Sequence, residues 1–303
     1  MKGSLAFLAG MLSVAAAAAP VFKADPPKAC EPCEAWNVPQ EPYRIFGNTY
    51  FVGTEGLSSI LIASADGLIL LDGGLPQSAP LIIANIRALG FKVEDIRLIV
   101  NSHMHYDHAG GIAALQRVSG AKVAASPASA HALEQGGPPE DDPQYTFGRE
   151  HNEFPKVPKV RVLRDDEMLR VGELAITAHF TPGHTPGGTS WTWRSCEAAK
   201  CLDLVYADSL NPVSAPDFRF TGDGKQASRV EDFRRSIARV EALPCDVLLA
   251  PHPPLFDMKN KIERRAREPA TNPFVDAQAC KAYAAKARRN LDERIAQESA
   301  SPN

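Results

Sequence analysis

The sequence has no marked excess of charge of either sign, and it has no long apolar run beyond its first 19 residues. Its 303 residues include 33 Lys and Arg against 36 Asp and Glu, a formal net charge of −3. A chain with this balance lacks the excess of positive charge on which nucleic-acid binding depends, so we expect no nucleic-acid partner. Its hydrophobic content of 44 % excludes an intrinsically disordered chain. These absences leave a folded globular protein as the expectation.

The one long apolar run lies at the N-terminus. Lys2 precedes Leu5–Ala19 (LAFLAGMLSVAAAAA), in which Ser13 is the only polar residue. The run is shorter than the roughly 20 residues of a transmembrane helix, and small residues suited to signal peptidase follow. We expect a signal peptide over residues 1–19, cleaved within 17–24, with a retained membrane anchor as the alternative. The mature protein is then expected to be periplasmic or secreted, with no membrane attachment.

Residues 20–35 form a Pro-rich arm that precedes a single folded domain expected over residues 36–303. The arm holds a CxxC motif, Cys30 and Cys33. A redox pair or half of a zinc site would need a second CxxC or a βαβ context, which the sequence lacks. A local disulfide or two free thiols are the favoured alternatives.

Cysteine is scarce, with six in the chain, but export would place these residues in an oxidising compartment. Cys196 and Cys201 flank a four-residue loop between two strand-like runs, which would allow a local disulfide. Cys245 precedes a buried strand, and Cys280 begins the last predicted helix. A bridge between them would close a long loop and pin that helix to the core.

The rest of the chain alternates strand-like and helix-like segments. Alternating or continuous apolar runs predict strands over Tyr43–Phe46, Thr49–Val52, Ser58–Ala63, Leu68–Asp72, Ile96–Asn101, Lys122–Ala125, Val160–Leu163, Met168–Val171, Leu174–Phe180, Thr189–Trp193, Leu202–Ala207 and Asp246–Ala250. Helical patterns cover Pro80–Leu89, Asp107–Val118, Ala128–Gln135, Ala227–Leu243 and Ala277–Ala296. The stretch 136–158 has no clear period, and loops of that length are usually functional or mobile. Two β-rich blocks, each followed by helices, predict one α/β domain of two sheets covered by helices.

A dense cluster of metal-ligand residues follows the buried strand Ile96–Asn101. The segment SHMHYDHAGG places His103, His105, Asp107 and His108 within six residues. His103 and His105 are two positions apart, so their side chains point the same way in an extended backbone. Asp107 and His108 lie at a predicted helix start, where a tight turn can aim them at a neighbouring point.

Two later histidines also follow strands. His184 lies in TPGHTPGG and His252 lies in APHP. One HxH motif is weak evidence, but HxHxDH with two further histidines at strand ends predicts a metal centre. His131, His151 and His179 lack such company, so we expect none of them to be a ligand.

Nitrogen and oxygen donors without cysteine suit zinc, and iron or manganese is also compatible. Five histidines and one aspartate exceed a single tetrahedral site. They predict two metal ions with open positions for water. A pair of this kind can share a hydroxide that is nucleophilic near neutral pH, which is a hydrolase design.

The HxHxDH motif resembles that of the metallo-β-lactamase superfamily, and the resemblance extends from about Trp36 to Ile295. More narrowly, SHMHYDHAGG, TPGHTPGGTSWTW, VYADSL and LLAPHP resemble the third subclass of metallo-β-lactamases, which are exported di-zinc enzymes. The resemblance implies an αββα sandwich of two mixed β-sheets flanked by helices. It also implies hydrolysis of penicillins, cephalosporins and carbapenems by a metal-bridging hydroxide, which confers antibiotic resistance. We expect a monomer whose partner is a small-molecule β-lactam.

The resemblance also assigns roles by position. The implied ligands are His103, His105 and His184 for the first zinc, and Asp107, His108 and His252 for the second zinc. Asp107 would also orient the hydroxide. Ser209 would hydrogen-bond a zinc-bound water or the substrate carboxylate. Asn211 stands where many members carry a second serine near that carboxylate, and Gln144 resembles a polar residue that some members place over the site.

The cysteine pairs fit the same subclass. Cys245 and Cys280 resemble one of its disulfides, and Cys196 and Cys201 resemble one found in some members.

Other chemistries on the same fold stay open. Thioester hydrolases of the glyoxalase II type hold both metals with an aspartate in a segment that Ala207-Asp208-Ser209 resembles, so an inward-facing Asp208 would favour a thioester or lactone substrate. Export and the PHP segment favour the lactamase. A non-catalytic zinc-binding protein is a third reading, which the complete ligand set disfavours. Asp72, after a buried strand, is expected either to orient a ligand histidine or to serve as a turn residue.

Overall fold

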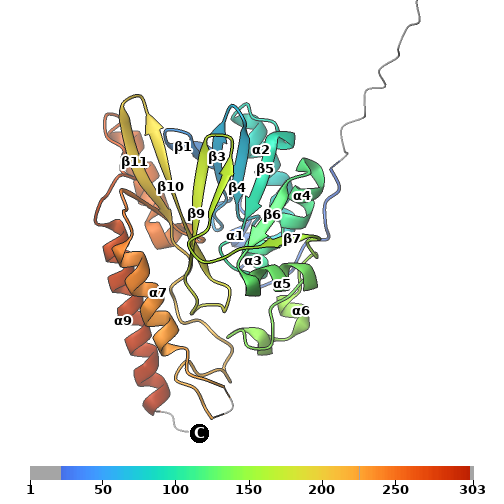
Figure 1. Cartoon of the computed structure of the whole chain (residues 1–303), viewed down its shortest axis with the longest axis vertical. Coiled ribbons are helices and arrows are strands. Elements are labelled where there is room, and N and C mark those ends of the chain that lie inside the picture. Colours follow the sequence, from blue (N-terminus) through green and yellow to red (C-terminus); the bar gives the residue numbers. More distant parts are fainter. Residues whose placement is uncertain (1–21, 225, 301–303) are drawn as a thin grey trace, which may run out of the picture.

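The computed structural model describes residues 22–224 and 226–300. The signal peptide predicted over residues 1–19 lies outside the described residues. In the described part of the chain, no helix is long and apolar enough to cross a membrane. The elements stack as helices, sheet, sheet and helices, which confirms the predicted αββα architecture (Figure 1).

The first sheet has seven strands in chain order, β1 to β7. Strands β1 to β4 are antiparallel, whereas β4 to β7 run parallel. Parallel neighbours need crossover connections, which contain helices here. The strands are β1 (Tyr43–Phe46), β2 (Thr49–Phe51), β3 (Ile60–Ser64), β4 (Gly67–Leu71), β5 (Ile96–Val100), β6 (Lys122–Ala125) and β7 (Val160–Val162).

The second sheet has five strands in the order β12-β11-β10-β9-β8. Its pairs are antiparallel except for β11 and β12, which run parallel. The strands are β8 (Met168–Val171), β9 (Leu174–Phe180), β10 (Thr189–Glu197), β11 (Lys200–Tyr206) and β12 (Val247–Leu249). Both sheets are therefore mixed.

Apolar side chains from both sheets fill the space between them. Trp191 and Trp193 on β10 are buried there. The indole N–H of Trp191 donates to the carbonyl oxygen of Asn101 at 3.1 Å, and that of Trp193 donates to Thr49 Oγ1 at 2.9 Å. Because Asn101 directly follows β5, the Trp191 bond ties the start of the histidine motif to the second sheet.

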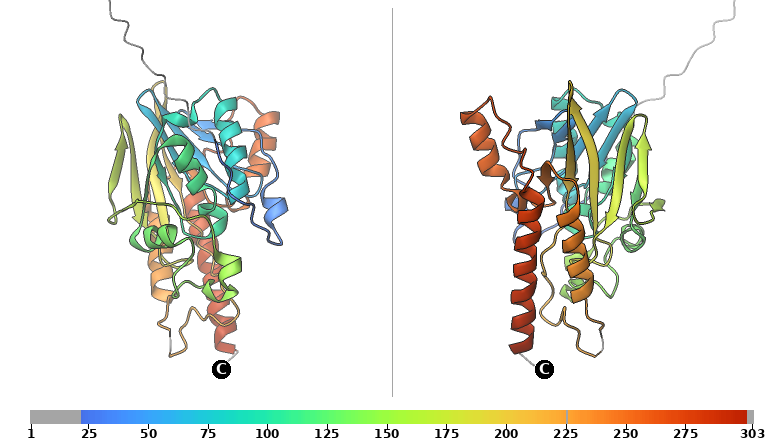
Figure 2. Two further views of the ribbon diagram at one scale, coloured as in Figure 1. Left: turned by 90° about the vertical axis from the view of Figure 1, so that its right-hand side faces the viewer. Right: turned by 60° about the vertical axis from the view of Figure 1, so that its left-hand side comes forward.

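Helices cover the outer face of each sheet. Helices α2 and α4 bury apolar side chains against the first sheet in a second core cluster. Helices α7 and α9 lie side by side on the second sheet (Figure 2). The helices are α1 (Cys33–Trp36), α2 (Ala79–Ala88), α3 (Tyr106–Ala109), α4 (Ile112–Ser119), α5 (Pro127–Gln135), α6 (Arg149–Asn152), α7 (Val230–Ala242), α8 (Met258–Arg267) and α9 (Ala279–Ala300).

The single helix predicted over Asp107–Val118 is wrong, because the chain breaks into α3 and α4 at Gly110 and Gly111. The break lets this segment approach the end of β4 closely. A Cβ atom on Gly111 would lie 2.2 Å from the carbonyl oxygen of Gly73, so no larger residue fits. The N–H of Gly73 in turn donates to the carbonyl oxygen of His108 at 2.8 Å. This packing fixes α3, which carries Asp107 and His108.

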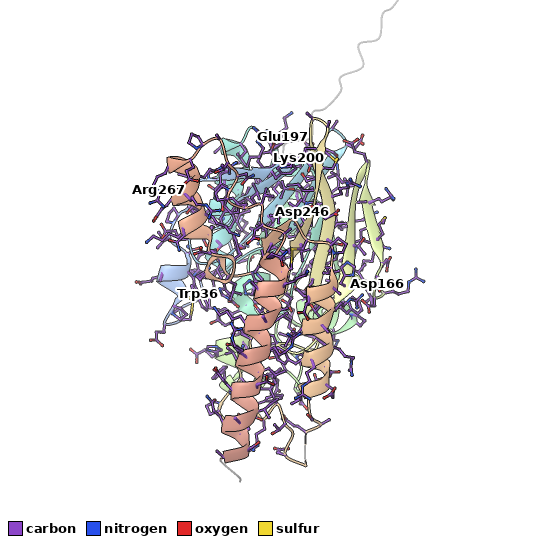
Figure 3. All side chains as sticks on the ribbon, turned by 90° about the vertical axis from the view of Figure 1, so that its left-hand side faces the viewer. Trp36, Asp166, Glu197, Lys200, Asp246 and Arg267 are labelled. Carbon is purple, nitrogen blue, oxygen red and sulfur yellow. A yellow bond between two sulfur atoms is a disulfide. The ribbon has the colours of Figure 1, made fainter. Side chains whose placement is uncertain are left out.

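Other elements differ from the sequence prediction at the surface. Helix α8 was not predicted because most of its residues are charged. Only Met258 is fully buried, and Ile262 packs partly buried against the core. Arg267 at the end of this helix lies at the outer edge of the molecule (Figure 3). Strands β10 and β11 extend to a two-residue turn, so Cys196 and Cys201 pair across strands instead of flanking a four-residue loop.

Three disulfides link cysteines of the described residues, and the loops that they close differ in length. Cys245–Cys280 spans 35 residues and joins the chain after α7 to the start of α9, whereas Cys196–Cys201 spans five. The third links Cys30 and Cys33 in the arm. On the loop-entropy model, the longer bridge contributes about 4 kcal/mol and the shorter about 2 kcal/mol.

This difference predicts the effect of removing each bridge. Replacing Cys245 and Cys280 together by Ser is expected to lower the free energy of unfolding by about 4 kcal/mol in urea titrations. The matched Cys196→Ser/Cys201→Ser variant should lose about half as much. Equal losses in the two variants would contradict the loop-length explanation.

Candidate metal centre

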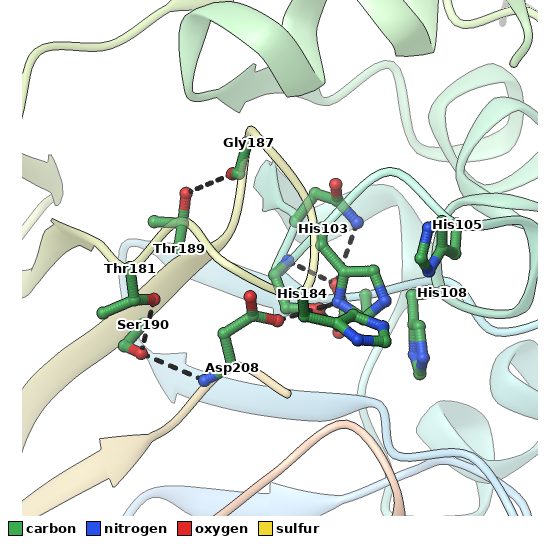
Figure 4. Close-up of polar contacts among 12 residues, drawn as sticks. His103, His105, His108, Thr181, His184, Gly187, Thr189, Ser190 and Asp208 are labelled. Carbon is green, nitrogen blue, oxygen red and sulfur yellow. Dashed lines mark hydrogen bonds and ion pairs between the residues drawn. The ribbon is translucent and has the colours of Figure 1, made fainter. Parts of the chain in front are cut away.

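The six predicted ligands come together at one edge of the two sheets. His103 and His105 follow β5, and α3 carries Asp107 and His108. His184 lies in the turn between β9 and β10, and His252 follows β12. The segment 103–108, the β9–β10 turn and the residues after β12 are distant in sequence and meet at this edge. Figure 4 shows His103, His105, His108 and His184 there.

Three of the histidines form a compact buried group. His103, His105 and His184 offer ring nitrogens that all lie within 4.8 Å of one another. Each pair of rings has its centroids 4.9 Å apart, and all three side chains are at most 5 % exposed. Such a group can hold a single metal ion.

Asp107, His108 and His252 form a second, tighter group. Asp107 Oδ2 lies 3.1 Å from His108 Nε2 and 3.3 Å from His252 Nε2, and the two Nε2 atoms are 3.3 Å apart. Tetrahedral zinc with bonds of about 2.0–2.1 Å would space its ligand atoms about 3.3 Å apart. The three atoms therefore have the spacing of one face of a zinc tetrahedron. His103 also lies within 4.8 Å of Asp107 and His108, so the two groups adjoin.

Oxygen partners orient the rings through their outer nitrogens, except at His108, whose Nδ1 is buried and has no partner within the described residues. His103 Nδ1 lies 2.8 Å from Asp208 Oδ1, and His184 Nδ1 lies 2.9 Å from the carbonyl oxygen of Asn211. His252 Nδ1 lies 3.2 Å from the carbonyl oxygen of Gly56. If the partnered nitrogen carries the proton, the other nitrogen of each neutral ring presents a lone pair.

Among the ring nitrogens that face the ligand groups, one lacks a hydrogen-bond partner. His103 Nε2 is buried and makes no hydrogen bond within the described residues. A buried polar atom without a partner is costly unless something binds it. A metal ion would satisfy this atom, so the residues present fit the metal that the sequence predicts.

Protonation states also favour metal binding. Burial, together with the neighbouring histidines, holds the pKa of His103 well below its usual range. Burial and the nearby His105 lower the pKa of His184 to about 3. Burial alone would raise the pKa of Asp107, but His108 and a hydrogen bond from His252 bring it well below the ordinary value. At neutral pH these groups are neutral imidazoles and a carboxylate, the forms that bind metals.

Two buried aspartates lie behind the ligand groups. Asp208 accepts from His103 on the ring edge away from the cluster, so it belongs to neither ligand group (Figure 4). Asp72 neither bonds a ligand histidine directly nor serves only as a turn residue. Its carboxylate accepts hydrogen bonds from the backbone and hydroxyl of Ser102, from the amide of Asn101 and from the hydroxyl of Tyr206. It thus fixes the strand end that leads into the histidine motif.

The predicted substrate contacts lie around this edge. Ser209 is buried, and it directly follows Asp208, whose Oδ1 lies beside His103 Nδ1. Asn211 turns its carbonyl towards His184, and its side-chain oxygen has no partner within the described residues. Gln144 is half-buried, and its backbone N–H donates to Asp142 at 2.9 Å.

Sequence reasoning missed Asp142, a buried residue whose Oδ1 lies 3.1 Å from His105 Nε2. It comes from the stretch 136–158, where no periodic pattern pointed to a buried side chain. The other three histidines lie outside both ligand groups, as expected: His131 on α5, His151 on α6 and His179 on β9.

Comparison with known proteins identifies relatives of this arrangement. The sequence profile of the Metallo-beta-lactamase superfamily matches residues 52–252. The solved Rm3 metallo-beta-lactamase is 51 % identical, with 89 % of this chain and 99 % of that chain covered and a TM-score of 0.86. MEM-A1, a subclass B3 metallo-beta-lactamase from a soil metagenome library, is 48 % identical over 88 % of this chain and 99 % of that chain, with a TM-score of 0.84.

Curated relatives are more distant. A hydroxyacylglutathione hydrolase from Anaeromyxobacter dehalogenans is 30 % identical over 189 residues, which are 62 % of this chain and 58 % of that protein. The chain spans about half the length of the curated relatives it matches. The histidine groups and these matches together indicate a metal-dependent hydrolase, with zinc as the metal that the donors and the relatives imply.

Proposed function

Because the chain belongs to the metallo-β-lactamase superfamily, we propose that it is a di-zinc β-lactamase that opens the ring amide of penicillins, cephalosporins and carbapenems. The observation that carries the proposal is the pair of adjoining ligand groups at one sheet edge. The likeness to subclass B3 enzymes over almost their whole length supports the choice of substrate. By this activity the protein would confer antibiotic resistance.

In this proposal each ligand group holds one zinc ion. The assignment is His103, His105 and His184 for the first ion, and Asp107, His108 and His252 for the second. Zinc bound there would act as a Lewis acid on the lactam carbonyl and would supply a nucleophile at neutral pH. The side chains would keep both ions fixed, because carboxylate or carbonyl oxygens hold the outer nitrogen of every ring except that of His108.

Residues at the rim would orient the substrate. Ser209 and Asn211 follow β11 directly beside the ligand groups, and the carbonyl oxygen of Asn211 lies 2.9 Å from His184 Nδ1. Gln144 would contribute from the stretch 136–158. These contacts would decide which β-lactam is preferred.

The position of Asp208 weighs against a thioester or lactone substrate. In the alternative mechanism this residue would hold both metals, but its carboxylate lies behind His103. The curated hydroxyacylglutathione hydrolase supports keeping the thioester alternative in the test.

The apolar N-terminal run and the three disulfides support export to an oxidising compartment.

The test is a substrate panel with the zinc-loaded protein. Initial rates would be measured on a penicillin, a cephalosporin, a carbapenem, a glutathione thioester and an acyl homoserine lactone. We expect turnover of the β-lactams at least about 100-fold above that of the other two, a ratio that a pocket with matched polar contacts can reach. Turnover of the thioester or lactone alone would overturn the β-lactamase assignment, and no turnover of any substrate would overturn both.

A further inference from the structure

His105 differs from the other partnered histidines in the ring nitrogen that it turns outward. His103, His184 and His252 each bond an oxygen through Nδ1, which leaves Nε2 for the cluster. His105 bonds Asp142 through Nε2, which leaves Nδ1. A wrong tautomer at His105 would therefore present an N–H, and not a lone pair, to the metal.

Asp142 is placed so that it can select this tautomer. Its side chain is fully buried, and its Oδ1 lies 3.1 Å from His105 Nε2. An ionised carboxylate is only an acceptor, so this contact requires the proton on Nε2. The backbone N–H of Gln144 also donates to Oδ1, at 2.9 Å, and so holds the carboxylate in place.

The backbone around Asp142 is tied to a second loop. The guanidinium of Arg229 donates to Asp141 at 2.6 Å. The N–H of Ala215 donates to the carbonyl oxygen of Pro143 at 2.9 Å. These two hydrogen bonds hold the residues on either side of Asp142. The backbone from which its carboxylate projects is therefore fixed, although Asp142 lies in a long stretch without a clear period.

We propose that Asp142 is a positioning residue that locks His105 in the Nε2–H tautomer and so sets the zinc affinity of the group formed with His103 and His184. The inference deepens the proposed function and rests on the zinc assignment made there. It adds a residue, and a stretch of chain, on which the metal site depends although neither supplies a ligand. The dependence runs through one hydrogen bond, which can be tested without a substrate.

The first test reads the tautomer directly in the wild-type protein loaded with zinc. Long-range ¹H–¹⁵N correlation spectra distinguish the protonated from the unprotonated ring nitrogen of each histidine. We expect the proton on Nε2 in His105 and on Nδ1 in His103 and His184. A proton on Nδ1 of His105 would overturn the proposal, whatever substrate the enzyme accepts.

The second test measures zinc affinity in competition with a chromophoric chelator. Asp142→Ala is expected to weaken the first zinc site by about 10–100-fold, the usual cost of losing a partner of this kind. Asp142→Asn keeps an acceptor for Nε2–H and should recover most of the affinity. The matched control is Glu140→Gln, which removes the same charge from an exposed position two residues away and should bind zinc as wild type.

The outcomes separate this inference from the proposed function. Wild-type affinity in Asp142→Ala, or equal losses in Asp142→Ala and Glu140→Gln, would overturn the positioning role and leave the β-lactamase proposal intact. A protein that binds zinc as expected but hydrolyses no β-lactam would overturn the β-lactamase proposal and leave the positioning role intact. If Asp142→Ala does not fold, the tautomer measurement and Asp142→Asn still decide.

Discussion

Dialysis against EDTA is expected to lower the hydrolytic rate by at least about 10³-fold, and added zinc should restore it. The six side chains proposed as ligands are histidines and an aspartate, and their distances fit a metal between them. Without an ion, nothing in these two groups supplies a strong nucleophile at neutral pH, whereas metal binding can lower the pKa of water from 15.7 to about 7. Rates and zinc content would be measured on the same samples.

Two controls make the chelation result specific. Circular dichroism of the dialysed protein would show that the loss does not come from unfolding. Asp166→Asn, a change at an exposed carboxylate whose partners His179 and Arg239 belong to neither ligand group, should respond to EDTA as wild type does (Figure 3). A rate that survives complete loss of zinc would rule out a metal-dependent mechanism.

Asp72→Ala is expected to lower the free energy of unfolding by about 4 kcal/mol, because several buried donors lose their acceptor at once. The Asp72 carboxylate accepts from the Ser102 backbone and hydroxyl at 2.7 Å each, from Tyr206 at 2.8 Å and from Asn101 at 3.1 Å. Each buried donor left unsatisfied costs about 1–3 kcal/mol, and relaxation recovers part of the sum. Asp72 also has a φ of +59°, which alanine tolerates poorly. Urea unfolding of the metal-free variant measures the loss.

The comparison variants for Asp72 separate its hydrogen bonds from its charge. Asp72→Asn keeps the size, one acceptor and a side chain that tolerates positive φ, so it should lose less than the alanine variant. Asp66→Ala, at the exposed turn between β3 and β4, should change stability by less than about 0.5 kcal/mol. A loss at Asp72 no larger than at Asp66 would contradict the network's role.

The fold could be predicted wherever burial leaves a pattern in the sequence. The bounds of β1, β6, β8 and β9 match the predicted strands, because each alternates or continues apolar residues against a core. Helix α8 left only a weak pattern, since most of its residues are charged and Met258 alone is fully buried. The break between α3 and α4 was missed because the close approach of Gly111 to Gly73 joins residues distant in sequence.

Site residues could be predicted from the sequence only where residue type and position after a strand reveal them. The predicted ligand residues can be identified by their type and by their position after strands, and the structure brings all six together. Asp142 cannot be identified in this way, since its partner His105 is 37 residues away and its own stretch has no period. The direction of Asp208 likewise depends on the tertiary fold, because sequence alone allowed it to face the metals or to lie behind them.

The ligands come from both sheets: His103 and His105 follow β5 of the first, whereas His184 and His252 follow β9 and β12 of the second. Zinc bound to such a set is a cross-link between the two halves of the sandwich, so the free energy of metal binding adds to that of folding. If zinc binds as proposed, we expect the lifetime of the protein to follow the zinc available around it. In zinc-poor surroundings the two halves would then separate more often, and proteases would gain access to the open chain.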